Sequence, residues 1–512
     1  MFEIFLGFIA LVYLIDIIAL FYFGVHCYVM VKLYLENRKE CQSDPETLQM
    51  LTGKMKKWPK VTVQLPMYNE MYVAERLIDA VAKIDYPKDL LEIQVLDDST
   101  DETQLIAEKK TKEYQKKGFN IQYIHRTNRD GHKAGALKAA MKKATGNYIA
   151  IFDADFIPSI DFLRKTIPYF YESKDIGMVQ TRWGHINADY SILTKAQSIG
   201  IDGHFSIEQV ARAGGNLWLN FNGTAGVWRK SCILDAGNWE SDTLTEDFDL
   251  SYRAELKGWK FKYLADVVNP AELPATVAAY KSQQFRWCKG SIQTAVKLIP
   301  RILKADVSWK IKLEAITHLT NYSVHPLMII NILATLPLLY FQEEFTQLSL
   351  PAIFAFAVFL SIGTFGPMTM YMVSQKSLYK DWVRRAIWLP ILTMIGTGIA
   401  VNNTKAWLEA VMGKKSAFVR TPKLKLETRG DKMEERSAYG QVKLDTLVFW
   451  ELALVAYILV TISMAISTGK TFVVPYMLLY AGGFLYVATA SIWSTMKQYI
   501  AIRRAAVTKT DF

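Results

Sequence analysis

The sequence has few cysteines, and none of them lie close together in the chain. Its 512 residues contain four, Cys27, Cys41, Cys232 and Cys288. Zinc sites need closely spaced ligands, and small disulfide-stabilised domains need many cysteines. The spacing therefore argues against both, and it fits a reducing, cytosolic setting for the soluble part of the protein.

Long hydrophobic runs are missing from the middle of the chain, although 51% of its residues are hydrophobic. Residues 4–31 are almost wholly apolar, residues 36–60 are charged, and long apolar runs return only after about residue 315. This distribution predicts a soluble domain of roughly 280 residues held between membrane segments. The first run is too long for a signal peptide and lacks a small-residue cleavage site, so we expect residues 1–35 to form a retained transmembrane helix.

The net charge of +11 is not gathered in one basic patch. Lysines and arginines instead lie beside the apolar runs, at residues 38–39, 376–385, 414–425 and 497–504. The positive-inside rule gives this distribution in membrane proteins. We therefore expect these charges to face a lipid bilayer and not a nucleic acid.

Between residues 60 and 262, short apolar runs alternate with helical patterns. Strands are predicted at residues 61–65, 93–96, 121–124, 149–152 and 178–180, and helices at 71–82, 102–117, 133–144 and 160–171. Such alternation predicts an α/β domain with a mainly parallel sheet covered on both faces. Sheets of this class bind ligands at the carboxyl ends of their strands.

Polar side chains follow the second and third predicted strands. Asp97 and Asp98 could accept hydrogen bonds from a nucleobase or ribose, whereas Thr100 and Asp101 are explained by capping of the next helix. Lys133 begins the helix after the third strand, where it and the helix amides could hold a phosphate. A single lysine at a helix start is weak support by itself.

The fourth predicted strand ends at Asp153 and Asp155. In an extended chain, two carboxylates at this spacing point to the same side. They suit Mg²⁺ or Mn²⁺ carried by a diphosphate. The pattern also arises by chance or as an ordinary strand exit. Its position after three other ligand-like strand ends, the first at residues 66–70, favours the functional interpretation.

Three later stretches add candidate ligands. Residues 221–226 form a small-residue turn that would let a ligand approach the backbone. Residues 245–249 are acidic, which is equally typical of a solvated helix start. Arg286 offers a planar cation for a diphosphate and Trp287 a flat face for a sugar, although both residue types also anchor helices at membrane surfaces.

Taken together, these residues resemble the family 2 processive glycosyltransferases of GT-A fold, the group of cellulose, hyaluronan and mannan synthases. The resemblance covers about residues 1–500. It rests on four motifs in a fixed order: Asp97 with Asp98, Asp153 with Asp155, Thr245 to Asp247, and the Gln283, Arg286 and Trp287 pattern. Residues 95–101, 133–138 and 221–229 look most like the glucomannan and mannan synthase branch. The resemblance implies a GT-A-type nucleotide-sugar-binding domain joined to an α-helical transmembrane bundle.

The resemblance also implies a role for each motif. The donor nucleotide and diphosphate would contact Asp97, Asp98, Lys133, Asp153, Gln283 and Arg286. Mg²⁺ or Mn²⁺ would be held by Asp155 and Asp153. Asp247 would be the general base, with Glu246 and Thr245 beside it. Trp287, Phe221, Asn222 and Gly223 would bind the acceptor sugar. Phe418, Thr421 and Lys423 would form a gating loop, in which Arg420 replaces the valine of the family pattern.

The apolar runs predict five transmembrane spans, at residues 4–31, 318–341, 351–373, 444–467 and 472–493, with an interfacial helix at 387–401. This arrangement places the N-terminus outside and the catalytic domain in the cytosol. The expected domains are a helix at 1–35, the transferase at 55–300, two spans and the interfacial helix at 301–415, the gating loop at 416–443, two spans at 444–495 and a basic tail at 496–512.

The expected function is processive, inverting polymerisation of a hexose from GDP-mannose or UDP-glucose onto a growing polysaccharide, with passage of the product across the membrane. One alternative is a non-processive transferase that moves a single sugar to a lipid, since some lipid glycosyltransferases share the pattern around Arg286. Another is a transporter whose soluble domain only binds nucleotide, although such a domain has no use for a base at Asp247.

Overall fold

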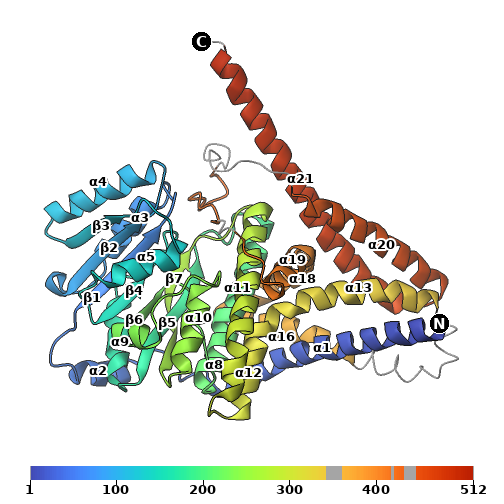
Figure 1. Cartoon of the computed structure of the whole chain (residues 1–512), viewed down its shortest axis with the longest axis horizontal. Helices are drawn as coiled ribbons and strands as arrows, with labels where there is room; N and C mark the ends of the chain where they lie inside the picture. Colours follow the sequence, from blue (N-terminus) through green and yellow to red (C-terminus); the bar gives the residue numbers. More distant parts are fainter. Residues whose placement is uncertain (1, 342–359, 417–419, 432–444, 511–512) are drawn as a thin grey trace.

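The computed structural model describes residues 2–341, 360–416, 420–431 and 445–510. An α/β domain lies at one end of the molecule, and long helices extend from it at the other end (Figure 1). The α/β domain contains a seven-stranded sheet of order β3-β2-β1-β4-β6-β5-β7. Four of its six strand pairings are parallel, so the predicted class of sheet is confirmed.

The first half of the sheet follows the predicted alternation of strands and helices. Its parallel strands are β1 (Val61–Met67), β2 (Leu91–Asp97), β3 (Asn120–His125) and β4 (Tyr148–Ile151). The helices between them are α3 (Ala74–Ala82), α4 (Thr103–Lys116) and α5 (His132–Met141). Every residue of β1, β2 and β4 is buried. β4 is accordingly a continuous apolar run, whereas buried polar side chains of β1 pair with those of β2, Thr62 with Glu92 and Gln64 with Gln94.

The second half contains two strands that the sequence pattern does not predict. β6 (Gly226–Arg229) runs antiparallel between β4 and β5 (Ile176–His185), and β7 (Lys260–Ala271) pairs with β5. β6 has only four residues, and β7 mixes lysines with apolar residues, so neither gives a clear period. Because Gly226 pairs with Ile151, the turn at 221–225 lies beside the end of β4.

The predicted helix at 160–171 is wrong in its second half. The α-helix α6 covers only Phe162–Thr166, and Ile167–Tyr171 form a 3₁₀ turn. Pro168 has no amide hydrogen to continue an α-helix, which accounts for the change. Short helices at α2 (Pro45–Gly53), α8 (Gln209–Gly214) and α9 (Lys230–Asp235) were also not predicted.

Helix α11 (Val277–Lys304) stands between the sheet and the long helices (Figure 1). Two buried ion pairs join it to that side. Lys281 Nζ lies 2.6 Å from Glu451 Oε1 on α20 (Leu447–Ser467), and Lys289 Nζ lies 2.8 Å from Glu409 Oε2 on α19 (Ala400–Val411). Breaking a buried pair by removing one partner is strongly destabilising. α11 is therefore fixed to both parts of the molecule.

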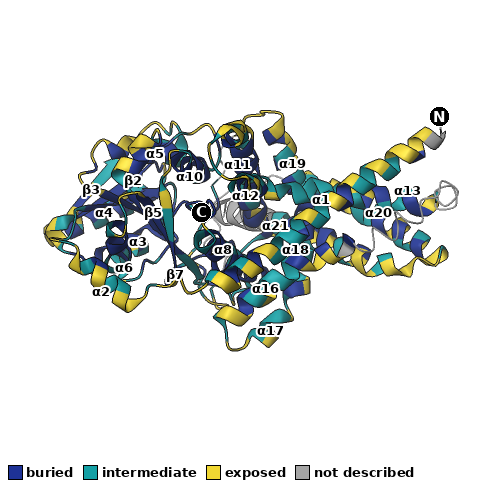
Figure 2. Cartoon of the chain, turned by 90° about the horizontal axis from the view of Figure 1, so that it is seen from below, coloured by how far each residue is buried: buried dark blue, intermediate teal, exposed yellow. Residues whose placement is uncertain are grey.

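Four helices among the described residues are long and apolar enough to cross a membrane: Ile4–Asn37, Trp309–Tyr340, Leu447–Ser467 and Thr471–Lys497. They contain α1 (Phe2–Asn37), α12 (Trp309–Thr320), α13 (Val324–Tyr340), α20 and part of α21 (Val474–Thr510). Figure 2 shows much exposed surface on α1, α13 and α20. Large apolar side chains lie there, among them Phe8, Leu11, Phe449 and Leu459. Such surfaces suit contact with lipid chains.

These four helices coincide with four of the five predicted spans. Of the remaining predicted span, 351–373, residues 351–359 lie outside the described residues. Ser361–Thr364 form a 3₁₀ turn, and the last part belongs to α16 (Phe365–Leu378). The predicted interfacial segment 387–401 falls on α18 (Leu389–Gly398) and the start of α19. Residues Trp382–Gly398 and Ala400–Val411 meet at an angle of 44° and together have the length and composition of one further span. The orientation of the chain in the membrane stays a prediction.

Candidate active site

A cavity of about 160 Å³ lies at the carboxyl ends of β1 and β4. The starts of α5, α10 (Glu246–Glu255) and α11 also border it, as does a segment at residues 420–423. Fourteen of the predicted site residues line this one cavity: Asp98, Lys133, Asp153, Asp155, Asn222, Gly223, Thr245, Glu246, Asp247, Gln283, Arg286, Trp287, Thr421 and Lys423. The fold therefore brings together residues that lie as far as 325 positions apart in the sequence, from 98 to 423.

Asp153 and Asp155 follow β4 directly, and each faces a lysine. Asp153 Oδ1 lies 2.5 Å from Lys133 Nζ, and Asp155 Oδ2 lies 2.6 Å from Lys423 Nζ. The amide of Asp153 also donates to Thr224 Oγ1 at 2.9 Å, which fixes the strand end to the neighbouring turn. Both aspartates direct carboxylate oxygens to a shared cavity.

This donor set fits a divalent cation. Carboxylate oxygens are the ligands that Mg²⁺ and Mn²⁺ prefer, and each aspartate has a second oxygen besides the one that contacts a lysine. The side chain of Asp153 is 33% exposed and that of Asp155 is 7% exposed, so Asp153 is the more accessible of the two. The lysines supply positive charge beside the same oxygens.

Asp247 lies in the first turn of α10. Its Oδ1 accepts a hydrogen bond from the Phe248 amide at 2.9 Å. Burial and the neighbouring Glu246 raise the pKa of Asp247 to about 7, although Lys133 acts in the opposite direction. Such a value suits a group that takes a proton near neutral pH.

Gly223 leaves room for Asp247 at the cavity wall. A Cβ atom at residue 223 would lie 2.8 Å from Asp247 Oδ2, and the backbone there has φ of +84°. Both the close approach and the left-handed backbone require glycine. The carbonyl of Gly223 accepts a hydrogen bond from Lys133 Nζ at 3.0 Å, so one lysine links this turn to Asp153.

Helices α10 and α11 approach closely where their motifs meet. A Cβ atom at Gly290 would lie 2.5 Å from Thr245 Cγ2, so only glycine allows this contact on α11. The approach sets Thr245 to Asp247 against the helix that carries Gln283, Arg286 and Trp287. The predicted proximity of these two motifs is thus seen in the structure.

Four buried polar atoms of cavity-lining residues have no hydrogen-bond partner in the part of the chain that the structure describes. They are Trp183 Nε1, His185 Nδ1, Gln283 Oε1 and Thr421 Oγ1. Buried polar groups are nearly always paired in folded proteins. Unpaired atoms around one cavity therefore favour a polar ligand that completes the site.

Two predicted site residues do not line the cavity. Asp97 is fully buried, and it accepts hydrogen bonds from Tyr123 Oη at 2.6 Å and from the Ser99 amide at 2.9 Å. Phe221 is also fully buried and packs edge-to-face on Trp228 inside the core. As the structure stands, Asp97 supports the strand end and Phe221 supports the turn, and neither presents its side chain to a ligand. Phe418 lies outside the described residues.

Asp98 does line the cavity, but its carboxylate is already paired. Arg126 Nε donates to Asp98 Oδ1 at 2.7 Å, and a second guanidinium nitrogen contacts Oδ2. Next to it, the guanidinium of Arg129 lies 3.4 Å from the ring centre of Tyr68. Tyr68 and Arg129 also line the cavity and were missed, although the position of Tyr68 just after β1 gave a signal of the same kind as Asp98.

Residues 420–431, called here the gating segment, lie across the cavity. Both carboxylate oxygens of Glu272 accept backbone N–H groups of this segment, from Leu424 and Lys425 at 3.0 Å each. Arg76 Nη1 pairs with Glu427 at 2.6 Å. Glu272 was missed because it follows β7, which the sequence pattern did not predict.

Glu70 is a second buried acid of the cavity that was not predicted as a site residue. Burial raises the pKa of Glu70 to about 7, and Arg420 opposes the shift from 3.6 Å away. Glu70 thus connects the start of the gating segment to the strand end of β1. Its position in a strand-end sequence, after Tyr68, was the available signal.

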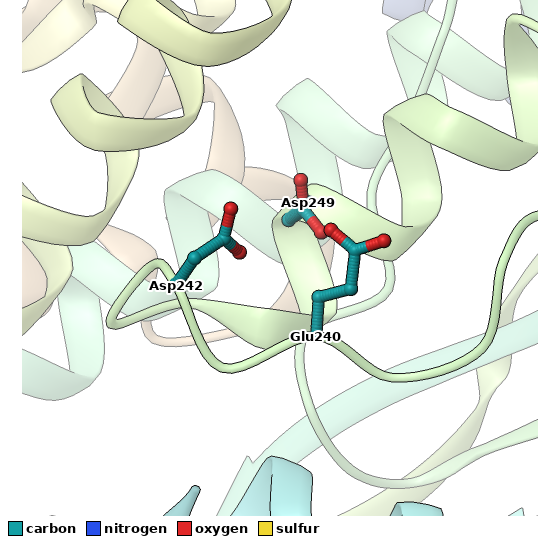
Figure 3. A group of neighbouring side chains, drawn as sticks. All are labelled: Glu240, Asp242 and Asp249. Atoms are coloured by element: carbon teal, nitrogen blue, oxygen red, sulfur yellow. The ribbon is translucent and has the colours of Figure 1, made fainter.

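Another acidic group, Glu240, Asp242 and Asp249, lies outside the cavity (Figure 3). Their oxygens lie close enough together to hold a metal ion, but Lys297 Nζ stands within 2.6 Å of Glu240, 2.7 Å of Asp242 and 2.9 Å of Asp249. One lysine thus contacts all three acids. None of them lines the cavity, whereas Asp153 and Asp155 do.

Comparisons with known proteins find similarity between the sheet domain and one family. Residues 59–290 match the family model described as glycosyltransferase like family 2. A probable glucomannan 4-beta-mannosyltransferase 11 of Oryza sativa subsp. japonica is 46% identical over 251 residues, which are 48% of this chain and 44% of that protein. Glucomannan 4-beta-mannosyltransferase 1 of Cyamopsis tetragonoloba is 40% identical over 279 residues, covering 54% of this chain and 53% of that protein.

One similar solved structure is the mannosyltransferase PcManGT from Pyrobaculum calidifontis in complex with GDP-Man and Mn2+. The two chains are 19% identical with a TM-score of 0.49, and the match covers 79% of this chain and 100% of that chain. The chain spans about half the length of the curated relatives that it matches. Residues 59–290 are therefore similar to glycosyltransferase family 2, and they contain the mainly parallel sheet and most of the residues that line the cavity.

Proposed function

We propose that this protein polymerises a hexose, mannose in the first place, from a nucleotide-sugar onto a growing β-linked polysaccharide. One observation carries the proposal: Asp247, a partly buried aspartate with a pKa raised to about 7, shares a cavity with Trp287 and with the two aspartates that suit a metal-bound diphosphate, Asp153 and Asp155. Mannose as the sugar rests on the names of the curated relatives, which are mannosyltransferases. GDP-mannose is the donor we expect, with UDP-glucose as the second choice.

In the proposed reaction, the carboxylate of Asp247 removes the proton from an acceptor hydroxyl. The acceptor oxygen then attacks the anomeric carbon, and the bond from that carbon to the diphosphate oxygen breaks. The diphosphate leaves with the electron pair, and the configuration at the anomeric carbon inverts. This single displacement needs one base and no enzyme nucleophile, unlike the retaining glycosidases.

The remaining residues bind and position the substrates. Lys133 and Arg286 place positive charge where the diphosphate would lie. Burial alone would lower the pKa of Lys133, but Asp153 and Glu246 raise it, so the ammonium stays charged. Asp98 and the neighbouring Tyr68 would contact the nucleoside, and a direct contact from Asp97 stays a prediction.

Asp153 and Asp155 would hold Mg²⁺ or Mn²⁺. When bound, the ion would neutralise negative charge on the departing diphosphate. Lys423, which contacts Asp155 in this structure, would then be released toward the nucleotide. The position of the gating segment would thereby depend on whether the ion is bound.

Trp287 would stack on the acceptor sugar, next to the turn that carries Asn222 and Gly223. The proposal places the transferase in the cytosol and the product's path through the adjoining helices. α11, which carries Trp287, is fixed to α19 and α20 by buried ion pairs, and this connection supports such a path.

The full chain in lipid nanodiscs would be incubated with GDP-mannose or UDP-glucose and Mg²⁺ or Mn²⁺. Released nucleoside diphosphate and polymer would be measured, and the polymer digested with linkage-specific hydrolases. Polymer sensitive to β-mannanase is the expected result. Formation of a single glycolipid, with no polymer in the presence of oligosaccharide acceptors, would contradict the proposal.

A further inference from the structure

A π-helical turn lies behind the predicted acceptor subsite. It covers His204–Glu208, between α7 (Ile192–Gly203) and α8. Turns of this type are rare and often occur at functional sites. Here the turn places its first and last residues in contact, because His204 Nδ1 lies 2.9 Å from Glu208 Oε2.

The other nitrogen of His204 faces Asn222, which lines the cavity. The distance from His204 Nε2 to Asn222 Nδ2 is 2.9 Å, and Gln209 Nε2 donates to Asn222 Oδ1 at 2.7 Å. Because Gln209 Nε2 is a donor, the Asn222 atom that faces it must be the amide oxygen. The Asn222 nitrogen is thereby directed to His204, whose Nε2 must accept the hydrogen bond.

Glu208 determines which form of histidine is present. Burial alone would raise the pKa of Glu208, but the hydrogen bond from His204 and the charge of Arg212 hold it well below its usual range. Arg212 Nε contacts the second oxygen, Oε1, at 3.3 Å. An ionised Glu208 accepts from Nδ1–H of His204, so Nε2 is left as the acceptor that Asn222 needs.

We propose that His204 and Glu208 are positioning residues that orient the Asn222 amide toward the acceptor sugar. With one Nδ2 hydrogen on His204, the second hydrogen and one lone pair of Oδ1 remain for sugar hydroxyls. An amide held at both ends loses little freedom when the sugar binds, which favours affinity. The inference rests on the proposed function, because it assigns a role within that function's acceptor subsite.

Two substitutions distinguish the contact of His204 with Asn222 from its contact with Glu208. The amide group of glutamine reaches the position of Nε2, whereas that of asparagine reaches the position of Nδ1. H204Q therefore keeps an acceptor for Asn222, and H204N keeps only the contact with Glu208. We expect H204N and H204A to raise the KM for short β-1,4-linked manno-oligosaccharides about five- to tenfold, as for one lost hydrogen bond.

H204Q should stay within about twofold of the wild type in the same KM, since it restores the acceptor atom. All three variants should leave the KM for GDP-mannose unchanged. The double variant H204A/N222A should match N222A alone, because the histidine acts only through Asn222. H26A is the matched control, since His26 forms a similar pair with Glu314 at 2.7 Å but has no contact with Asn222.

Additive effects in the double variant, or equal loss in H204Q and H204N, would overturn the assignment. Thermal unfolding of each variant identifies those that fail to fold, and H204Q then carries the test as the conservative variant. Failure of the proposed function looks different: the wild type itself would form no polymer and release no nucleoside diphosphate with any donor.

Discussion

The two walls of the cavity differ in how their charges are satisfied. On the donor wall, built by β1 to β4 and α5, the carboxylates are already paired: Asp98 with Arg126, Asp153 with Lys133 and Asp155 with Lys423. On the acceptor wall, built by α10, α11 and the 221–226 turn, Asp247 is partly buried with a raised pKa, and Gln283 Oε1 has no hydrogen-bond partner among the described residues.

This difference assigns binding of the donor to one wall and proton transfer to the other. A carboxylate that contacts a lysine can exchange that lysine for a metal and a diphosphate. Desolvation raises the proton affinity of a carboxylate, as a general base requires. The walls are therefore suited to different steps of one transfer, and each of the following predictions tests one wall.

Asp247→Asn should have the largest effect, because it removes the base and leaves the donor wall intact. We expect sugar transfer to fall by at least about a hundredfold. Binding of GDP with Mn²⁺, measured by calorimetry, should change little. The matched control is Asp242→Asn, an exposed aspartate near α10 whose loss should leave both quantities unchanged. Polymer synthesis at the wild-type rate by Asp247→Asn would show that another group takes the proton.

Removal of the divalent ion should weaken binding of the nucleotide to the donor wall, which Asp247→Asn should leave almost unchanged. With excess chelator, or in Asp155→Asn, we expect GDP affinity to fall by about a hundredfold, since the diphosphate then lacks the cation that would neutralise its charge. Acceptor affinity should persist. Unchanged GDP binding without metal would mean that lysines alone hold the diphosphate.

The pH dependence of transfer should report the acceptor wall. The pKa of Asp247 is raised to about 7 by burial and Glu246, so below this pH the carboxyl is protonated and cannot act as a base. The rate should therefore rise with pH through about 7 and fall about tenfold for each unit below it. Glu70 titrates in the same range. Persistence of the acid limb in Glu70→Gln assigns it to Asp247, and its loss there would assign it to Glu70.

The donor wall was more predictable from sequence than the acceptor wall, for a physical reason. Asp98, Lys133 and Asp153 follow parallel strands, and the hydrophobic pattern of those strands predicts where each strand ends. Asn222 reaches the cavity through β6, a four-residue antiparallel strand that has no visible period. Glu272 follows β7 in the same way.

Burial was the other quantity that the sequence pattern could not supply. Asp97 and Phe221 lie in motifs of the resembled family, yet both side chains are fully buried and support their neighbours. Adjacent residues at a strand end point to opposite sides, so of Asp97 and Asp98 only one could face the cavity. The order of motifs identified the site, and side-chain packing decided which members of each motif line it.

Glu272→Ala should give the smallest effect and should fall on the donor wall. Glu272 accepts backbone N–H groups from Leu424 and Lys425, which holds Lys423 against Asp155. Loss of these bonds should raise the KM for GDP-mannose about three- to tenfold. This factor corresponds to the net free energy of one or two hydrogen bonds. The KM for oligosaccharide acceptors should stay constant. Glu172→Ala, which removes an exposed ion pair with Lys262 outside the cavity, is the matched control. A changed acceptor KM with an unchanged donor KM would mean that the gating segment serves the acceptor wall, and the division between the two walls would then have to be redrawn.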